Sequence, residues 1–217
     1  LRDPIIKKFS EILDLTFKEA SIQELVLRYH DFFGSLVNQS ESSAEPIVGN
    51  LWQDHILNLV LTDENPFSLQ CEKTGIAGLG RDLIQLTQRD LALLRKLYDF
   101  DFSSITSCMK ERSDEFSLDF PEPYSIERGE AFPFPESYFK EKYNVKKLMG
   151  DLPEWDQCIN ILGKFYHEKG CGIFARFWAF KWVSDKVIDQ LVGISNPDPI
   201  TLNDLIGYED QKQQGLR

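Results

Sequence analysis

The cysteines and histidines are the first residues of this chain to consider for nucleophilic chemistry, because a neutral imidazole can take the proton of a thiol and leave a reactive thiolate. The sequence has four cysteines and three histidines: Cys71, Cys108, Cys158, Cys171, His30, His55 and His167. Nearness along the chain gives one candidate pair, Cys158 or Cys171 with His167. Nothing else in the spacing supports this pair, and packing or surface roles are the simpler interpretation of all seven residues.

Metal and disulfide patterns are missing from the sequence. It contains no C-x-x-C pair, no H-E-x-x-H motif and no acidic calcium-loop pattern, so the usual zinc, redox and EF-hand signatures do not apply. Four cysteines in 217 residues are too few for a disulfide scaffold. The sequence predicts free, buried thiols and no metal site.

Two glycine-containing stretches differ from the known phosphate-binding loops. A Walker A loop needs a glycine, four residues, then Gly-Lys-Ser/Thr, so that backbone N–H groups surround the phosphates. Gly163-Lys164-Phe165 lacks both the earlier glycine and the hydroxyl. The run from Gly75 to Gly80 does not match G-x-G-x-x-G, and no clear strand precedes it. We interpret both stretches as structural and expect no cofactor to bind this chain by itself.

The first two thirds of the chain predict helices with explicit start signals. Asp3-Pro4 and Asn50 are cap residues, Ser21 to Glu24 matches a capping box, and Asn65-Pro66 marks a turn. Apolar residues follow each cap at helical spacing. The polar stretch 39–45 predicts a loop. The long amphipathic segment 80–100 predicts a helix at the centre of a small bundle.

Residues 111–139 differ in character from the helices. Seven acids and two bases lie between Glu111 and Glu130, a net charge of 2 − 7 = −5. Four prolines, at positions 121, 123, 133 and 135, oppose regular structure, while aromatic residues recur throughout. One interpretation is a long ordered loop pinned to the helices by its phenylalanines. The alternative is a mobile acidic segment that docks on a partner.

The C-terminal third predicts one more helix and a hairpin. Asp151 to Glu154 begins the helix, which Lys169-Gly170 ends. Residues 173–182 are aromatic with a period of two, and 187–194 offer a second strand. Two strands alone are marginally stable, so we expect the hairpin, about 172–194, to pack on the helices. The predicted fold class is mainly α: a small helical bundle with a C-terminal aromatic β-hairpin (α+β).

Composition excludes several functional classes. Apolar residues make up 42% of the chain, enough for a core, and the formal net charge is −11. An acidic chain is poorly suited to neutralising phosphates. We therefore favour packing in a core or interface over the stacking of nucleic-acid bases as the role of the aromatic residues in 174–182. No apolar run is long enough to cross a membrane, and no secretion signal opens the chain. We expect a cytoplasmic protein without nucleic-acid or membrane partners.

Two motifs near the end of the sequence carry a resemblance to a known family. One is the aromatic run ending in Ala179-Phe180-Lys181-Trp182; the other extends from Asp198-Pro199-Ile200 through Asp204-Leu205-Ile206-Gly207-Tyr208 to Lys212. Together they resemble the segment just before the P-loop in a family of bacterial AAA-type ATPases, domain-of-unknown-function family eight-fifteen. The resemblance covers residues 170–217. Weaker similarity extends to 65–72 and 89–91.

The resemblance implies a function for the longer protein of which this chain would be a part. ATP and Mg²⁺ would bind an ATPase module whose Walker A, Walker B and sensor elements come after Arg217. Leu205, Ile206, Gly207 and Tyr208 would line the adenine side of that site in the intact protein only. We therefore expect both ends to be cut and the 217-residue chain not to hold ATP tightly.

Three hypotheses remain from the sequence. The favoured one is a non-catalytic N-terminal accessory domain, residues 1–195, that recognises a protein partner or substrate or restrains the motor. Residues 196–217 would then be a linker and the first residues of the AAA-type ATPase module. The alternatives are a stand-alone oligomerisation or interaction module, and an enzyme with an unrecognised Cys/His site.

Overall fold

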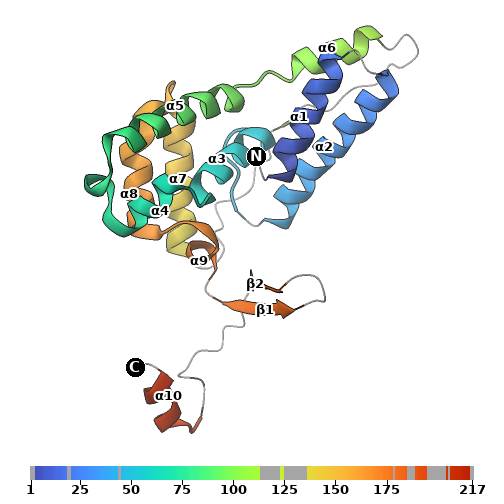
Figure 1. The fold of residues 1–217 in the computed structure, drawn as a ribbon. Coiled ribbons are helices and arrows are strands. Elements are labelled where there is room, and N and C mark those ends of the chain that lie inside the picture. The colour runs from blue at the N-terminus through green and yellow to red at the C-terminus, as the bar shows by residue number, and fades with distance from the viewer. Residues whose placement is uncertain are drawn as a thin grey trace. The chain divides into compact units, whose positions relative to one another are not determined.

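The computed structural model describes residues 3–18, 21–43, 45–112, 123–124, 136–177, 179–184, 189–194, 204 and 206–215. The chain divides into two units, Leu1–Ala175 and Arg176–Arg217, and each is described by itself. The first unit is helical (Figure 1). Its helices are α1 (Pro4–Phe17), α2 (Ile22–Ser42), α3 (Leu51–Thr62), α4 (Pro66–Thr74), α5 (Arg81–Tyr98), α6 (Ser103–Arg112), α7 (Glu136–Asp151), α8 (Ile159–Lys169) and α9 (Gly172–Arg176), with 3-10 turns η1 (Ile76–Gly78) and η2 (Trp155–Cys158).

The helix starts predicted at Asp3, Ser21 and Asn50 are confirmed by their capping bonds, whereas the start predicted at Asp151 is wrong, since α7 ends there and α8 begins at Ile159. Asn65, predicted to mark a turn, begins α4. Asp3 accepts a hydrogen bond of 2.8 Å from the backbone N–H of Ile6, and the Ser21 hydroxyl accepts one of 3.2 Å from Glu24. Asn50 and Asn65 each form a complete capping box, with Gln53 and Ser68 respectively. Each box satisfies N–H groups that the first helical turn leaves without partners.

The core forms around α3. Eight of its twelve residues are buried, Asp54 and His55 among them, as expected for a helix that neighbouring helices cover on several sides. Trp52 at its start belongs to an aromatic cluster with ring centroids 4.6 to 6.0 Å apart, contributed by α1, α2, α3 and the connection between α5 and α6: Phe9, Phe32, Trp52, Phe100 and Phe102. The cluster joins the N-terminal helices to the rest of the unit.

The helix predicted over 80–100 exists as α5, but its predicted central place is wrong. Of its side chains only Leu91 and Tyr98 are fully buried. Its apolar residues cover one side, which packs on α3, α4, α8 and η2. A helix whose apolar residues lie on one side only is expected at the surface of a bundle. The central helix is α3.

Two predicted loops are partly helical. The stretch 39–45 was expected to be a loop, but α2 continues to Ser42. The hydroxyls of Ser40 and Ser42 bond to the carbonyl oxygens of Val37 and Gln39, so small polar residues continue the helix at a solvated end. The predicted loop 111–139 is also too long, because α6 ends at Arg112 and α7 begins at Glu136. Its interior, except Pro123 and Tyr124, lies outside the described residues.

The second unit contains the predicted hairpin. Strands β1 (Phe180–Ser184) and β2 (Asp189–Gly193) pair antiparallel, with Phe180 opposite Gly193 and Trp182 opposite Leu191. The first strand was predicted to begin at Ile173, which is wrong: residues 172–176 form α9. A short apolar run does not distinguish strand from helix by periodicity, and the left-handed Gly172 starts a new turn there. Helix α10 (Glu209–Gly215) completes the described elements.

The predicted fold class, mainly α with a C-terminal β-hairpin, is confirmed by these elements. Throughout the described part of the chain, no helix combines the length and the apolar content needed to cross a membrane.

Candidate functional site

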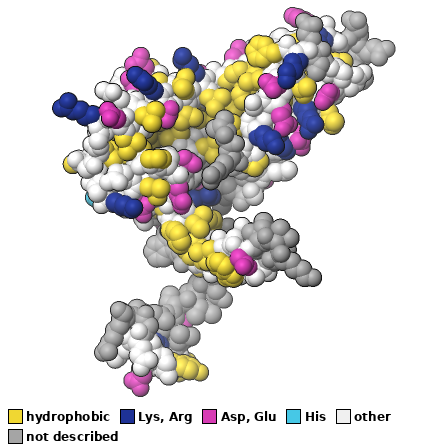
Figure 2. Space-filling model, in the orientation of Figure 1, with side chains coloured by type: hydrophobic (Ala, Val, Ile, Leu, Met, Phe, Trp, Pro, Cys, Tyr) yellow, Lys and Arg dark blue, Asp and Glu magenta, His cyan; other side chains and the backbone are white. Residues whose placement is uncertain are grey.

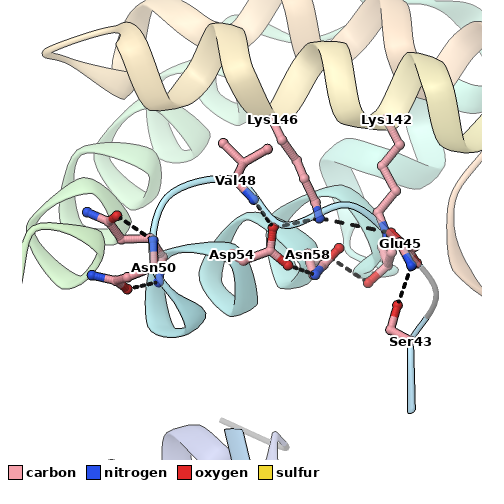
Figure 3. A network of polar contacts seen from close by, with 10 residues as sticks. Ser43, Glu45, Val48, Asn50, Asp54, Asn58, Lys142 and Lys146 are labelled. Carbon is pink, nitrogen blue, oxygen red and sulfur yellow. Dashed lines mark hydrogen bonds and ion pairs between the residues drawn. The ribbon is translucent and has the colours of Figure 1, made fainter. Parts of the chain in front are cut away.

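A network of buried charges is the most elaborate polar feature of the helical unit (Figure 3). It joins α3, α7 and the connection between α2 and α3. Lys142 and Lys146 project from one face of α7, with side chains only 2% and 1% exposed. Since an isolated buried ammonium group is very costly, both lysines require acidic partners. Glu45 and Asp54 supply them.

Asp54 is the acceptor at the centre of the network. Its Oδ1 accepts hydrogen bonds from Lys146 Nζ at 2.9 Å and from the backbone N–H of Val48 at 2.8 Å. Its Oδ2 accepts one of 2.8 Å from the side-chain amide of Asn58, one turn later on α3. Three donors therefore hold this carboxylate, and it fixes the connection at Val48 to both α3 and α7.

Glu45 is the second acid of the network. Its Oε2 accepts a hydrogen bond of 2.5 Å from Lys142 Nζ and lies 3.9 Å from Lys146 Nζ. The four charged groups balance, two ammonium groups against two carboxylates. Their mutual attraction offsets the loss of hydration only because the geometry is close and further donors complete it. The arrangement can fasten the α2–α3 connection, but its lysines are too buried to meet a ligand.

The sequence analysis missed this network because its members lie 92 and 97 residues apart. One signal was available. Lys142 and Lys146 share a helical face with the buried Tyr138, Val145 and Met149. Two lysines on an apolar stripe indicate buried acids from another element.

The candidate Cys/His pair is not assembled in the described structure. His167 Nδ1 donates to backbone carbonyl oxygens, at 3.2 Å to Cys71 and 3.3 Å to Glu72. The thiol of Cys171 donates instead to Glu72 Oε2, at 3.2 Å. Cys158 is buried at the end of η2. No hydrogen bond between His167 and either thiol is found among the described residues.

The buried thiols are poor nucleophiles. Burial raises the pKa of Cys71, Cys158 and Cys171 to about 11, and at Cys171 the hydrogen bond to Glu72 adds to the effect. A thiol with a raised pKa forms little of the thiolate that reacts. All four cysteines are free, as predicted, but Cys108 is only partly buried.

The residues predicted to line an adenine pocket lie in the second unit. Leu205 is outside the described residues. Ile206 and Tyr208 are 96% and 67% exposed, and Gly207 and Tyr208 both have left-handed backbone, with φ of 81° and 65°. The carbonyl oxygen of Tyr208 accepts from the backbone N–H of Lys212 and so opens α10. A left-handed tyrosine is unusual outside turns, and here it presents an exposed ring beside a glycine.

No group of three or more histidine, cysteine, aspartate or glutamate side chains that could hold a metal occurs among the described residues. Comparison of the chain with protein-family models, curated proteins and solved structures finds no match.

Proposed function

We propose that residues 1–195 are a non-catalytic accessory domain of an AAA-type ATPase, acting in the cytoplasm on a protein partner or substrate. Residues 196–217 would connect this domain to the ATPase module. ATP and Mg²⁺ would bind the intact protein, with Leu205, Ile206, Gly207 and Tyr208 beside the adenine. The chain's own ATPase module would be the first partner of the domain.

The observation that carries the proposal is the exposed Ile206-Gly207-Tyr208 turn. Its residues resemble the motif that precedes the P-loop in the ATPase family, and glycine allows close approach of the backbone to a flat base. Apolar side chains such as Ile206 are suited to cover the faces of an adenine. In the described structure these side chains are exposed, which fits a site wall that needs further chain to complete it.

The helical unit supports an accessory-domain role, but it ends at Ala175, before the hairpin, and not at the proposed boundary at residue 195. The helical unit has its own core and buried charge network, and the motif lies in the other unit. In the helical unit burial raises the pKa of Cys71, Cys158 and Cys171, and His167 is hydrogen-bonded to backbone carbonyl oxygens. These features favour recognition over catalysis for the helical unit.

The test compares the 217-residue chain with the same chain carried on into the residues its gene encodes next. Binding of a fluorescent ATP analogue is measured by anisotropy. The proposal expects no binding in the micromolar range by the 217-residue chain, binding by the longer chain, and weaker binding after Gly207→Val in the longer chain. Micromolar binding or ATP hydrolysis by the 217-residue chain alone contradicts the proposal. So does a continuation without a G-x-x-x-x-G-K-[ST] sequence.

A further inference from the structure

The outer side of α5 carries five residues in a regular order. The inner side of the helix is fixed to the unit by Leu91, Tyr98 and the hydrogen bonds of Arg95. Successive residues on the outer side are four and three positions apart in alternation, which is the spacing of residues at a helix-pairing interface. We call this set the α5 seam: Asp82, Leu86, Arg89, Leu93 and Lys96.

The seam is exposed along its whole length. Leu86 and Leu93 are 56% and 62% exposed, two turns apart on one side of the helix. Figure 1 draws α5 along the outer side of the helical unit, and Figure 2 shows hydrophobic side chains among acidic and basic ones there. Single exposed leucines are ordinary. Two of them at heptad spacing between opposite charges are not explained by the fold of the unit.

The order of charges in the seam is self-complementary for antiparallel pairing. An acid lies at the N-terminal end and a base at the C-terminal end, and the leucines lie three residues before and four residues after Arg89. When a second α5 is laid antiparallel with a two-fold axis near Arg89, Asp82 faces Lys96 of the other copy and Leu86 faces Leu93. Each contact then occurs twice, as an isologous interface requires. Parallel pairing would instead place Asp82 on Asp82 and Lys96 on Lys96.

Arg89 lies at the axis of this arrangement, where two like charges meet. Its neighbour Asp90 is also exposed, and in antiparallel register it flanks the guanidinium of the other copy. Neither residue forms an ion pair within the described part of the chain. Both are thus available for pairing between copies: the long side chain of Arg89 can extend past Arg89 of the other copy and reach Asp90 of that copy.

From these observations we infer that two copies of this chain associate through antiparallel pairing of their α5 seams. The inference goes beyond the proposed function and does not depend on it. The 18 residues of α5 span about 27 Å at 1.5 Å per residue. A contact of this size is smaller than a standard stable interface, so the association is a weak, salt-sensitive dimer.

Sedimentation of the 217-residue chain from about 1 µM to about 1 mM, the range in which weak dimers become populated, tests the pairing. The expected result is a monomer–dimer equilibrium that Leu86→Glu with Leu93→Glu abolishes. The matched control is Leu148→Glu, an exposed leucine on α7, which should leave the equilibrium unchanged. A chain that stays monomeric throughout overturns the inference, as does a dimer that survives the double change.

A charge exchange tests the antiparallel register. Asp82→Lys alone and Lys96→Asp alone should each weaken the dimer by about tenfold, because each creates two like-charge contacts. An equal mixture of the two variant chains should associate, and so should the chain that carries both changes. Because both positions are exposed, neither change should unfold α5, and thermal melting of each variant checks this. If the dimer forms in the mixture but not in the double variant, the helices pair in parallel. If it forms in neither, the chains associate through another surface. Both outcomes overturn the inference.

Discussion

Arg95 Nη1 donates a hydrogen bond of 2.6 Å to the carbonyl oxygen of Leu152. The same nitrogen lies 3.3 Å from the carbonyl oxygen of Gly150, while Nε bonds to Asp99 at 2.6 Å. The guanidinium also covers the ring of Trp155, at 5.8 Å from its centroid. One side chain therefore joins the end of α5 to the end of α7 and the start of η2.

Arg95→Lys should destabilise the helical unit by about 1 to 3 kcal/mol, because a lysine cannot reproduce the planar fork or the stacking. Denaturant unfolding followed by circular dichroism measures the change. Gln85→Ala, on the exposed side of the same helix, is the control and should change the free energy of unfolding by less than about 0.5 kcal/mol. Equal effects of the two variants would contradict this role of Arg95.

The buried charge network gives a second prediction. Lys146→Met should cost about 3 to 5 kcal/mol, since it leaves Asp54 buried with an uncompensated charge. Adding Asp54→Asn should recover part of that loss, because the neutral amide oxygen can still accept from Val48. Lys147→Met, which removes an exposed lysine next along the chain, should be nearly neutral. Unfolding free energies that rank these three variants differently would show that the network does not behave as a charge-balanced unit.

Gly172 gives a third prediction, on backbone geometry. Its φ is 70°, and an added Cβ would lie 1.7 Å from Glu64 Oε1. Gly172→Ala should therefore destabilise the unit by more than about 1 kcal/mol. Gly34→Ala, in α2 with nothing within 4 Å of the added atom, should stabilise it by about 0.5 to 1 kcal/mol.

Glu64→Ala in the Gly172→Ala background separates two causes of the loss. It removes the steric overlap but leaves the left-handed backbone. A complete recovery of the melting temperature would mean that the overlap accounts for the whole cost, whereas we expect only a partial one.

Three helix starts could be predicted from the sequence because capping is local: Asp3, Ser21 and Asn50 each contact a residue three positions away. Helix α7 was not predicted, because the prolines and acidic residues before it led to a loop being predicted as far as residue 139, which includes its first turn. The buried network could not be found, since pairing Lys142 with Glu45 depends on how distant helices pack. The exposed positions of Ile206 and Tyr208 likewise do not follow from their residue types.

The pair of Asp3 and His55 gives a pH-dependent prediction. His55 Nε2 lies 3.0 Å from Asp3 Oδ1 and donates to it, because an ionised carboxylate only accepts. Partial burial acts to raise the pKa of Asp3, but the hydrogen bonds from His55 and Ile6 outweigh it, and the pKa is lowered from 3.8. A carboxyl group with a lowered pKa stabilises the fold above its unfolded pKa and loses that effect as the pH falls through the folded value.

Asp3→Asn should therefore be less stable than the original chain at pH 7, and the difference should shrink as the pH is lowered from about 5 to about 3. Ser21→Ala removes a cap without an ionisable group and should cost about 1 kcal/mol at every pH in this range. Urea unfolding at each pH measures both differences. A constant difference for Asp3→Asn would show that the carboxylate of Asp3 does not carry the effect.

The thiols give a prediction about reactivity. Cys108 is partly exposed, and the other three cysteines are buried with pKa values raised to about 11. Alkylation with iodoacetamide at pH 8, followed by peptide mass spectrometry, should label Cys108 first. The other three should react at least about tenfold more slowly, because little thiolate forms at that pH. Rapid labelling of Cys171 would contradict its hydrogen bond to Glu72.

The long span of the Glu45–Lys142 and Asp54–Lys146 pairs, 97 and 92 residues, has a consequence for biosynthesis. A ribosome adding roughly 5 to 20 residues per second needs about 5 to 20 s to proceed from α3 to α7. During that interval neither acid has its lysine partner, although Asp54 can already accept hydrogen bonds from Val48 and Asn58, and the side of α3 that α7 later covers is exposed. Helices α7 and α8 supply the buried Met149, Phe165 and Tyr166, so a translation product that ends before Lys142 leaves both acids without their lysines and part of the core uncovered.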